Sequence, residues 1–355
     1  MFRSASTAHP SRRRRLLAAA GALTTPLLPE DFLTLFDPLW STTSLRGRVV
    51  ARRRETPRAV SVTIEPGRQW AGHRAGQYVG VGIEVDGVRY RRSYSLSSPE
   101  DSGHLTITVQ EVPDGVVSTK LVRDLPIGTI VELDRAAGEF TLPDPLPEKL
   151  LFVTAGSGIT PVMSMLRTLD RAGTMPDAVL VHSARTPEDT IFGAELAALA
   201  ARHPSLRVVF RHSAVTGRLD PGTLDETVPD RADRAVYACG PEGLLDALTG
   251  CWGDDVVAER FAPPGFGAVE GTGGTVELGE DTVEVEPGQS LLDAGEAAGK
   301  LLPSGCRMGI CFGCVLPLRE GQVRDLRTGE LHGEPGDMVQ TCINSACGPA
   351  RIDTP

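Results

Sequence analysis

The sequence reads Cys306-Arg-Met-Gly-Ile-Cys311-Phe-Gly-Cys314 near its carboxyl end, and a fourth cysteine follows at Cys342. Three thiolates within nine residues, joined by a distant fourth, can surround a small inorganic cluster. The four cysteines Cys306, Cys311, Cys314 and Cys342 therefore predict an iron–sulfur site. We expect this part of the protein to carry single electrons.

The spacing distinguishes this site from other uses of cysteine. Zinc sites are usually built from Cys-x2-Cys pairs, whereas intervals of four, two and then many residues are typical of plant-type [2Fe-2S] ligands. Glycines at positions 305, 309 and 313 allow the tight turns that such a loop needs. Cys347 is an alternative fourth ligand, but the spacing favours Cys342. We expect Cys347 and Cys251 to be packing residues.

Length and charge narrow the class of protein. A chain of 355 residues is long enough for two or three domains. Its net charge of -10 argues against a nucleic-acid partner, which needs a basic face. Residues 265–355 hold 14 Asp and Glu against 6 Lys and Arg, a net charge of -8. This acidic segment predicts a protein partner with a basic docking face.

The N-terminal segment leaves the location of the protein open. With most of the seven cysteines assigned to a cluster, no disulfide framework remains, which indicates a reducing, cytoplasmic compartment. Arg12 to Arg15 precede an apolar stretch from Leu16 to Leu28 that is too short to span a bilayer. Three alternatives stand: an exported protein, an arm that contacts the inner membrane face peripherally, and an arm that is disordered or docked locally.

The pattern of apolar and polar residues changes along the chain and predicts a multidomain fold. Short alternating runs such as Val60–Ile64 and Leu105–Val109 indicate an antiparallel β-barrel. Buried strands then alternate with helical stretches, which indicates an α/β domain with a parallel sheet. A hairpin, a helix over residues 290–298 and the cysteine loop indicate an α+β β-grasp domain. The expected segments are an arm (1–44), the barrel (45–146), the α/β nucleotide domain (147–262), a linker (263–274) and the cluster domain (275–355).

The barrel segment carries Arg92-Ser93-Tyr94-Ser95, which resembles the flavin-binding signature of the ferredoxin-NADP reductase superfamily. Arg92 and Tyr94 are two residues apart on one strand and so point to the same face. The resemblance implies that Arg92 holds phosphate, Tyr94 packs on the isoalloxazine and Ser95 bonds near its reactive nitrogen, with Ser93 in the same signature. Taken alone, the motif is equally compatible with a surface arginine and a core tyrosine.

A second motif, Gly115-Val-Val117-Ser118-Thr119, is expected to open a helix over residues 119–124. A helix N-terminus with a serine hydroxyl suits phosphate, although the same geometry makes Ser118 a plain N-cap. The resemblance implies that this segment holds the flavin pyrophosphate. It favours FAD over FMN.

Two further motifs lie where buried strands end. Gly156 and Gly158 form a strand-to-helix turn of the kind that approaches a dinucleotide, and Thr160 follows them. Cys239-Gly240-Pro241 ends the last expected strand of this domain. By resemblance, Thr160 and Cys239 lie beside the nicotinamide, and with Ser95 they are the expected catalytic positions; a buried structural cysteine is the alternative for Cys239.

The choice of nucleotide depends on Ser183 and Arg185, which follow the second strand of this domain and could bind a 2'-phosphate. Glu188 and Asp189 lie nearby and oppose that interpretation, so NADPH is favoured over NADH only on balance. Residues 259–261, Glu-Arg-Phe, resemble a closing segment near the flavin; a core phenylalanine beside a surface Glu-Arg pair explains them equally well.

Together the motifs resemble single-chain reductases that pass electrons from NADPH through FAD and a [2Fe-2S] cluster to a terminal oxygenase. Residues 26–33 and 37–41 further resemble actinobacterial reductases that supply a membrane fatty-acyl desaturase. The alternatives are a reductase for a soluble cytochrome P450 or ring-hydroxylating oxygenase, a non-catalytic redox-sensing subunit, and a hydrolase. The intact cofactor motifs argue against the second alternative, and the lack of a nucleophile motif argues against the third.

Overall fold

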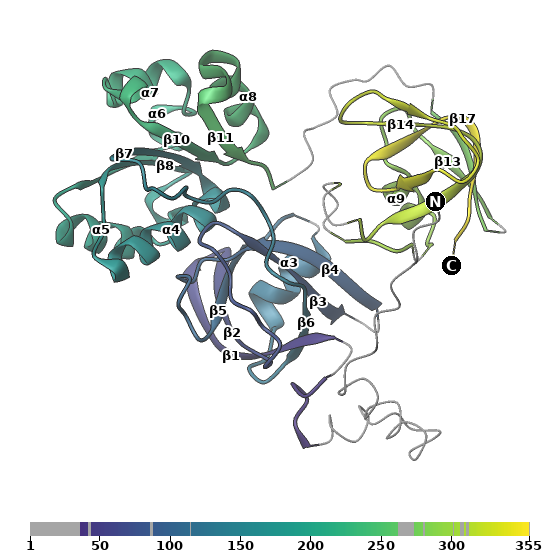
Figure 1. Cartoon of the computed structure of the whole chain (residues 1–355), viewed down its shortest axis with the longest axis horizontal. Coiled ribbons are helices and arrows are strands. Elements are labelled where there is room, and N and C mark those ends of the chain that lie inside the picture. The colour runs from purple at the N-terminus through teal and green to yellow at the C-terminus, as the bar shows by residue number, and fades with distance from the viewer. Residues whose placement is uncertain are drawn as a thin grey trace, which may run out of the picture.

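The computed structural model describes residues 36–41, 44–85, 88–113, 115–261, 273–279, 281–300, 302–305, 309 and 312–354. The expected N-terminal arm up to residue 35 and the linker residues 263–272 lie outside the described residues. Three sheets organise the rest of the chain (Figure 1).

The first sheet is an antiparallel barrel with strand order β4-β3-β6-β1-β2-β5. An isolated bridge between Leu96 and Ile107 joins its two outer strands and closes it. Apolar residues that alternate along the strands fill the interior, and a short helical segment after β5 plugs one end with Val117 and Leu121. The elements are β1 (Leu45–Thr56), β2 (Ala59–Pro66), β3 (Tyr78–Val85), β4 (Val88–Ser95), β5 (Leu105–Gln110), α3 (Val116–Thr119), a π-helical turn η1 (Lys120–Asp124) and β6 (Ile130–Leu133).

The second sheet is parallel, with strand order β11-β10-β7-β8-β9. Helices α4 and α5 cover one face and α7 and α8 the other, as Figure 1 shows. The chain starts in the middle at β7, runs outward to β9 and returns to β10, so the order reverses between β7 and β10. Ligands bind at such a switch point, beyond the carboxyl ends of the strands.

The strands of this domain lie where the sequence predicts buried strands that alternate with helices. They are β7 (Lys149–Ala155), η2 (Gly156–Gly158), α4 (Ile159–Ala172), β8 (Asp177–Ala184), η3 (Pro187–Asp189), α5 (Gly193–Arg202), β9 (Leu206–His212), α6 (Ser213–Thr216), α7 (Pro221–Thr227), η4 (Arg231–Asp233), β10 (Ala235–Cys239), α8 (Glu242–Trp252), η5 (Gly253–Asp255) and β11 (Val256–Glu259).

Helix α4 ties the barrel to the parallel sheet. The Ser164 hydroxyl donates to the carbonyl of Ser98 at 2.5 Å, and the Arg167 guanidinium donates to the carbonyl of Ser97 at 2.6 Å. Both acceptors lie just after β4. The glycine turn that precedes α4 is therefore held in a fixed position relative to the end of β4.

The third sheet has strand order β13-β12-β17-β14-β15, with β16 paired to β14. Helix α9 packs on it, and the Ser290 hydroxyl caps that helix by accepting from the Asp293 amide at 3.1 Å. The expected hairpin and helix are both present. The elements are β12 (Gly274–Leu278), β13 (Asp281–Val285), α9 (Leu291–Ala297), β14 (Val315–Asp325), β15 (Leu331–His332), β16 (Met338–Gln340) and β17 (Asn344–Ile352).

Candidate functional site

A cavity of about 450 Å³ lies where the barrel meets the parallel sheet. It contains residues from the start of β3, the end of β4, the end of β5 with the start of α3, the turn after β7 with the start of α4, and the end of β11 with the two residues that follow it. Its lining residues are Tyr78, Arg92, Ser93, Tyr94, Ser95, Thr108, Val109, Gln110, Val112, Gly115, Val116, Val117, Ser118, Ser157, Thr160, Glu259, Arg260 and Phe261.

The β4 wall of this cavity is the Arg92–Ser95 motif. Arg92 and Tyr94 share one face of the strand, as their spacing predicts, and Ser95 ends it. Burial raises the pKa of Tyr94, although the neighbouring Arg92 charge opposes the shift, so the phenol stays protonated. The wall therefore offers a guanidinium, a flat aromatic ring and two hydroxyls, the donor set that suits the phosphate and ring system of a flavin.

The segment after β5 forms the opposite wall. Helix α3 begins at Val116, three residues earlier than expected, and Gly115 is its N-cap. Ser118 is therefore not the N-cap: its hydroxyl donates to the Gly115 carbonyl at 3.2 Å and accepts from the Val112 amide at 3.1 Å. A Cβ at position 115 would lie 2.5 Å from that hydroxyl, so only glycine keeps this close approach. Gly115, Val117 and Ser118 line the cavity, whereas Thr119 is not among the lining residues.

A second cavity, of about 400 Å³, adjoins the first and lies at the switch point of the parallel sheet. The turns after β7 and β10 meet there. Gly156 has a positive φ of 56°, and a Cβ at Gly158 would lie 2.1 Å from the Cys239 carbonyl oxygen. The lining residues are Gln110, Ala155, Gly156, Ser157, Gly158, Gly240, Pro241, Glu242, Leu245, Arg260 and Phe261. Two glycine turns in van der Waals contact leave backbone groups open to an extended ligand such as a dinucleotide.

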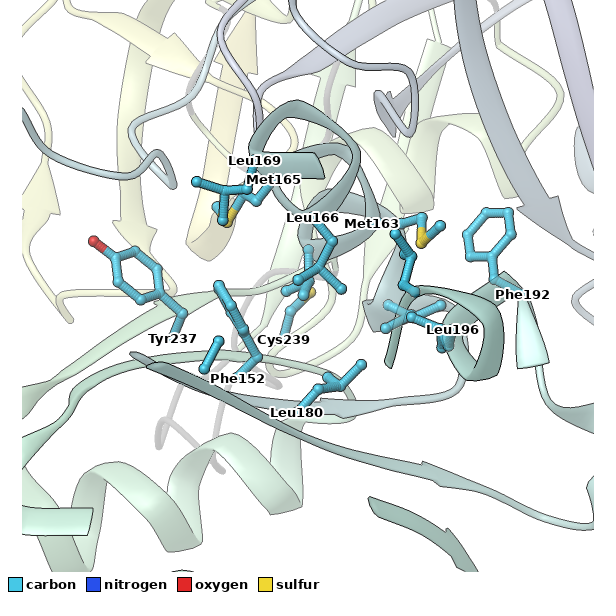
Figure 2. Close-up of a cluster of buried hydrophobic side chains, with 14 of the residues drawn as sticks. Phe152, Met163, Met165, Leu166, Leu169, Leu180, Phe192, Leu196, Tyr237 and Cys239 are labelled. Carbon is cyan, nitrogen blue, oxygen red and sulfur yellow. The ribbon is translucent and has the colours of Figure 1, made fainter. Parts of the chain in front are cut away.

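Cys239 is fully buried and belongs to the apolar cluster between the sheet and α4, where it lies near Phe152 and Tyr237 (Figure 2). It is not among the residues that line either cavity. Burial, with a smaller effect of the Glu259 carboxyl, raises the pKa of the thiol, so it is uncharged. Thr160, by contrast, lines the larger cavity, and its hydroxyl donates to the Ser157 carbonyl at 3.0 Å.

Glu259 and Phe261 do not fit the alternative of a core phenylalanine beside a surface Glu-Arg pair. Phe261 is not a core residue: it is 43% exposed and lines both cavities. Glu259 is half-buried, and the Ser95 hydroxyl donates to its carboxyl at 3.3 Å. Burial raises the pKa of Glu259 to about 8, even though the bond from Ser95 lowers it. The carboxyl is therefore largely protonated at neutral pH.

Arg260 lies at the boundary of the two cavities and lines both. Its Nη2 donates to the Asp246 carboxylate on α8 at 2.7 Å, which fixes the guanidinium. Its buried Nη1 has no hydrogen-bond partner within the described part of the chain. A buried cationic donor without a partner is costly unless a ligand satisfies it. Position 260 therefore fits the phosphates of a dinucleotide.

Ser183 and Arg185 sit at the carboxyl edge of the sheet but line neither cavity. Ser183 is buried at the end of β8 and pairs in register with Ala155, next to the glycine turn. Arg185 follows β8 and is exposed. Asp189 accepts a bond from the Thr186 hydroxyl at 3.1 Å, so its carboxylate is engaged within the local turn.

In the third domain, Cys314 and Cys342 are buried and their sulfur atoms lie 3.1 Å apart. That separation is too long for a disulfide, and it places the two thiols side by side, as neighbouring ligands of one metal ion are. Cys306 and Cys311 lie outside the described residues. Cys347 is in β17, in a bridge with Gly273, and not at this pair.

Gln340 and Thr341 hold the cysteine loop in place. The Gln340 side-chain amide donates to the Gly309 carbonyl at 2.9 Å, and both the amide and the hydroxyl of Thr341 donate to the Cys314 carbonyl. Gly309 has a positive φ of 72°, and a Cβ there would meet the Arg327 guanidinium at 2.6 Å. The described part of the loop therefore has the glycine turn and the backbone anchoring that a [2Fe-2S] site requires.

Several lining residues carry no motif that the sequence interpretation used. Gln110 and Ser157 belong to both cavities, and Tyr78 lines the larger one. Arg260 lies in the Glu-Arg-Phe segment that resembles a closing segment near the flavin, but the resemblance did not imply its place between the two cavities; a charged residue just beyond the last strand of a parallel sheet lies at the ligand-binding edge. The others become visible only through pairing between distant strands.

Family models match all three domains. The model described as "Oxidoreductase FAD-binding domain" matches residues 57–142, "Oxidoreductase NAD-binding domain" matches 152–249, and "2Fe-2S iron-sulfur cluster binding domain" matches 275–347. These matches confirm the three expected domain types and the three cofactor classes.

Curated relatives share this organisation along most of their length. The chain is 50% identical to an NADPH oxidoreductase of Mycobacterium tuberculosis over 346 residues, which are 94% of this chain and 90% of the relative. It is 30% identical to the glycine betaine monooxygenase reductase subunit of Pseudomonas aeruginosa, covering 79% of this chain and 86% of the relative.

A solved structure has the same arrangement of domains. Phthalate dioxygenase reductase, described as modular for electron transfer from pyridine nucleotides to [2Fe-2S], superimposes with a TM-score of 0.63 at 26% identity. The match covers 88% of this chain and 98% of that one.

Within the described residues, no helix is long and apolar enough to cross a membrane.

Proposed function

Because this chain belongs to the family of NAD(P)H oxidoreductases with an FAD-binding, an NAD-binding and a [2Fe-2S] domain, we propose that it supplies electrons from NADPH to a terminal oxygenase. The observation that carries the proposal is that the two cavities adjoin. They share Gln110, Ser157, Arg260 and Phe261, so a nucleotide in one would touch a flavin in the other.

Bound FAD can accept a hydride and release electrons singly, and a [2Fe-2S] cluster carries one electron. The protein supplies position and charge. Arg92 and the turn at Gly115 are placed to bind phosphate. The Ser95 hydroxyl, which donates a hydrogen bond to Glu259, lies at the end of the β4 wall. Gly156 and Gly158 let the nucleotide approach the backbone. These roles need no protein nucleophile.

Replacing one cluster ligand tests the electron order. In Cys314→Ser, we expect the [2Fe-2S] absorbance and cytochrome c reduction to be lost, because the thiolate is a ligand, whereas NADPH-dependent ferricyanide reduction by the flavin persists. Cys347→Ser is the matched control and should retain the cluster and both activities. Equal loss of both activities in Cys314→Ser would contradict the proposed order.

We propose NADPH as the reductant because Ser183 pairs in register with Ala155, next to the glycine turn, and Arg185 follows two residues later, while the Asp189 carboxylate is engaged by Thr186. The relative named NADPH oxidoreductase supports this choice. A charge-assisted hydrogen bond contributes about 1.5–3 kcal/mol. We therefore expect Arg185→Ala to lower kcat/KM for NADPH by roughly 10- to 100-fold and to leave kcat/KM for NADH unchanged. An unchanged NADPH-to-NADH preference would remove Arg185 from the 2'-phosphate site.

The acceptor is proposed to be an oxygenase, since relatives include reductase subunits of oxygenases. More specifically, we propose a membrane fatty-acyl desaturase as the acceptor, on the resemblance of residues 26–33 and 37–41. The first of these segments lies outside the described residues. The second segment docks on the barrel: Asp37 pairs with Arg48 at 3.0 Å, and Arg68 lies over Trp40. Its motif therefore has a structural role, which weakens it as support for a membrane acceptor.

Reconstitution separates the two acceptor classes. The holoprotein with NADPH is combined with membrane fractions or with soluble fractions, and acyl desaturation is scored against substrate hydroxylation. NADPH-dependent desaturation only with membranes supports the desaturase and a peripheral membrane location. Hydroxylation with the soluble fraction supports a soluble cytochrome P450 or ring-hydroxylating oxygenase instead.

A further inference from the structure

Phe312, between Cys311 and the buried ligand Cys314, has an unusual backbone conformation. Its φ is 56°, in the left-handed region that bulky residues rarely adopt. Its side chain is 68% exposed, so burial does not offset the strain. Phe192 provides the contrast, because it has a φ of 60° but is only 3% exposed and packs beneath Arg167. Strain without burial points to function at Phe312.

A second exposed apolar side chain lies beside the same loop. In the pairing of β16 with β14, Gln340 faces Val315 and Met338 faces Pro317. Side chains two residues apart on a strand share a face, and Gln340 reaches the loop at Gly309. Met338 is therefore on the loop side of β16, and it is 64% exposed. We call Phe312 and Met338 the apolar surface.

Two carboxylates lie next to Met338 in the chain. Glu334 and Asp337 precede Met338 in one turn, where the Asp337 carboxylate accepts from the Glu334 amide at 3.0 Å. The nearby Arg327 is neutralised by a bidentate pair with Asp325 at 2.8 and 3.2 Å. Exposed aromatic and methionine side chains close to charged residues are typical of protein interfaces.

Charge also indicates which partner fits. Residues 265–355 carry a net charge of -8. The barrel segment, residues 45–146, holds 14 basic against 13 acidic residues, and residues 147–264 hold 11 against 16. Neither of the protein's own cofactor domains is therefore basic. A surface with this field is complementary to a separate protein whose docking face is basic.

We propose that the apolar surface of Phe312 and Met338 is the contact through which a separate electron acceptor docks, one with an apolar centre ringed by Lys and Arg. The inference rests on the proposed function. One electron leaves the reduced cluster and reduces the acceptor's ferric iron to ferrous iron, and no bond or proton is exchanged. The side chain of Phe312 brings the acceptor against the loop that carries Cys314.

The test uses holoprotein, NADPH and cytochrome c, whose exposed haem edge is ringed by lysines, as the probe. Phe312→Asn removes the ring but keeps the loop, because asparagine tolerates a positive φ. We expect kcat/KM for cytochrome c to fall about tenfold at low salt, while Phe312→Trp stays within about twofold and Met338→Ala falls less than Phe312→Asn. Phe36→Asn, at a phenylalanine that is 82% exposed outside the cluster domain, is the matched control and should have no effect.

Stopped-flow reduction of the cluster by NADPH separates the outcomes. An unchanged rate in Phe312→Asn, together with slower cytochrome c reduction, supports the proposal. Unchanged cytochrome c reduction overturns it. A slower cluster-reduction rate also overturns it, because the surface would then contact the protein's own flavin domain. Wild-type protein whose cluster NADPH cannot reduce would refute the proposed function itself, whatever Phe312 does.

Discussion

Replacing Gly158 with alanine should separate the two turns that form the nucleotide cavity. A Cβ at this position would lie 2.1 Å from the Cys239 carbonyl oxygen and 2.8 Å from the Gly240 amide nitrogen, whereas real Cβ contacts are essentially never under 3.0 Å. Relief therefore needs a backbone shift of at least about 0.9 Å, from 2.1 to 3.0 Å. Both neighbours are main-chain atoms, one in the last residue of the paired strand β10 and one in the turn that follows it, so no side chain can absorb the shift.

A misplacement of about 1 Å at a reacting centre can cost about 100-fold in rate, which corresponds to about 2.7 kcal/mol of transition-state stabilisation. We therefore expect kcat/KM for NADPH in Gly158→Ala to fall about 100-fold. The assay is steady-state ferricyanide reduction, which needs the flavin and the nucleotide but not the cluster. FAD content and the [2Fe-2S] absorbance should be unchanged.

Gly243→Ala is the matched control in the same domain, because a Cβ there meets no atom within 4 Å and position 243 lies inside α8. It should leave kcat/KM unchanged and stabilise the protein by about 0.4–1 kcal/mol. Normal kcat/KM in Gly158→Ala would refute the reasoning, since the nucleotide would then not depend on the contact between the two turns.

Two further predictions concern Glu259, the last residue of β11, and Arg260, which follows it. Burial raises the pKa of Glu259 to about 8 from 4.5, so its contribution to stability is full below pH 4.5 and is lost as pH rises to about 8, at no more than about 1.4 kcal/mol per pH unit. Thermal unfolding followed between pH 5 and 9 should show less loss in Glu259→Gln, and parallel curves would contradict the shift. Arg260→Ala should raise KM for NADPH about 10- to 100-fold, because a cationic donor to phosphate is removed; Arg202→Ala, at an exposed pair with Asp170, should not change it. An unchanged KM in Arg260→Ala would exclude phosphate binding there.

Local sequence pattern was sufficient for the strands and for the glycine turn after β7. The run Ala235–Cys239 forms β10 with the expected bounds, because a parallel strand covered on both faces must be continuously apolar. The glycine turn after β7 also lies where expected, since its function requires a strand before it and a helix after it.

The start of α3 and the environment of Glu259 could not be predicted in this way. A helix after Gly115 begins without a side-chain cap, so a rule that looks for serine at the N-cap places the start too late. The environment of Glu259 depends on its pairing with Cys239 in β10, a contact between distant segments. The sequence around Glu259 contains no sign of that partner.

The most direct test of the electron path is to mix the anaerobic holoprotein with NADPH and record the electron paramagnetic resonance spectrum after freezing. We expect the signal of a reduced [2Fe-2S] cluster in the wild type and its absence in Cys314→Ser, with the flavin reduced in both. A reduced flavin without any cluster signal in wild-type protein would contradict the claim that electrons pass from the nucleotide through the flavin to the cysteine loop.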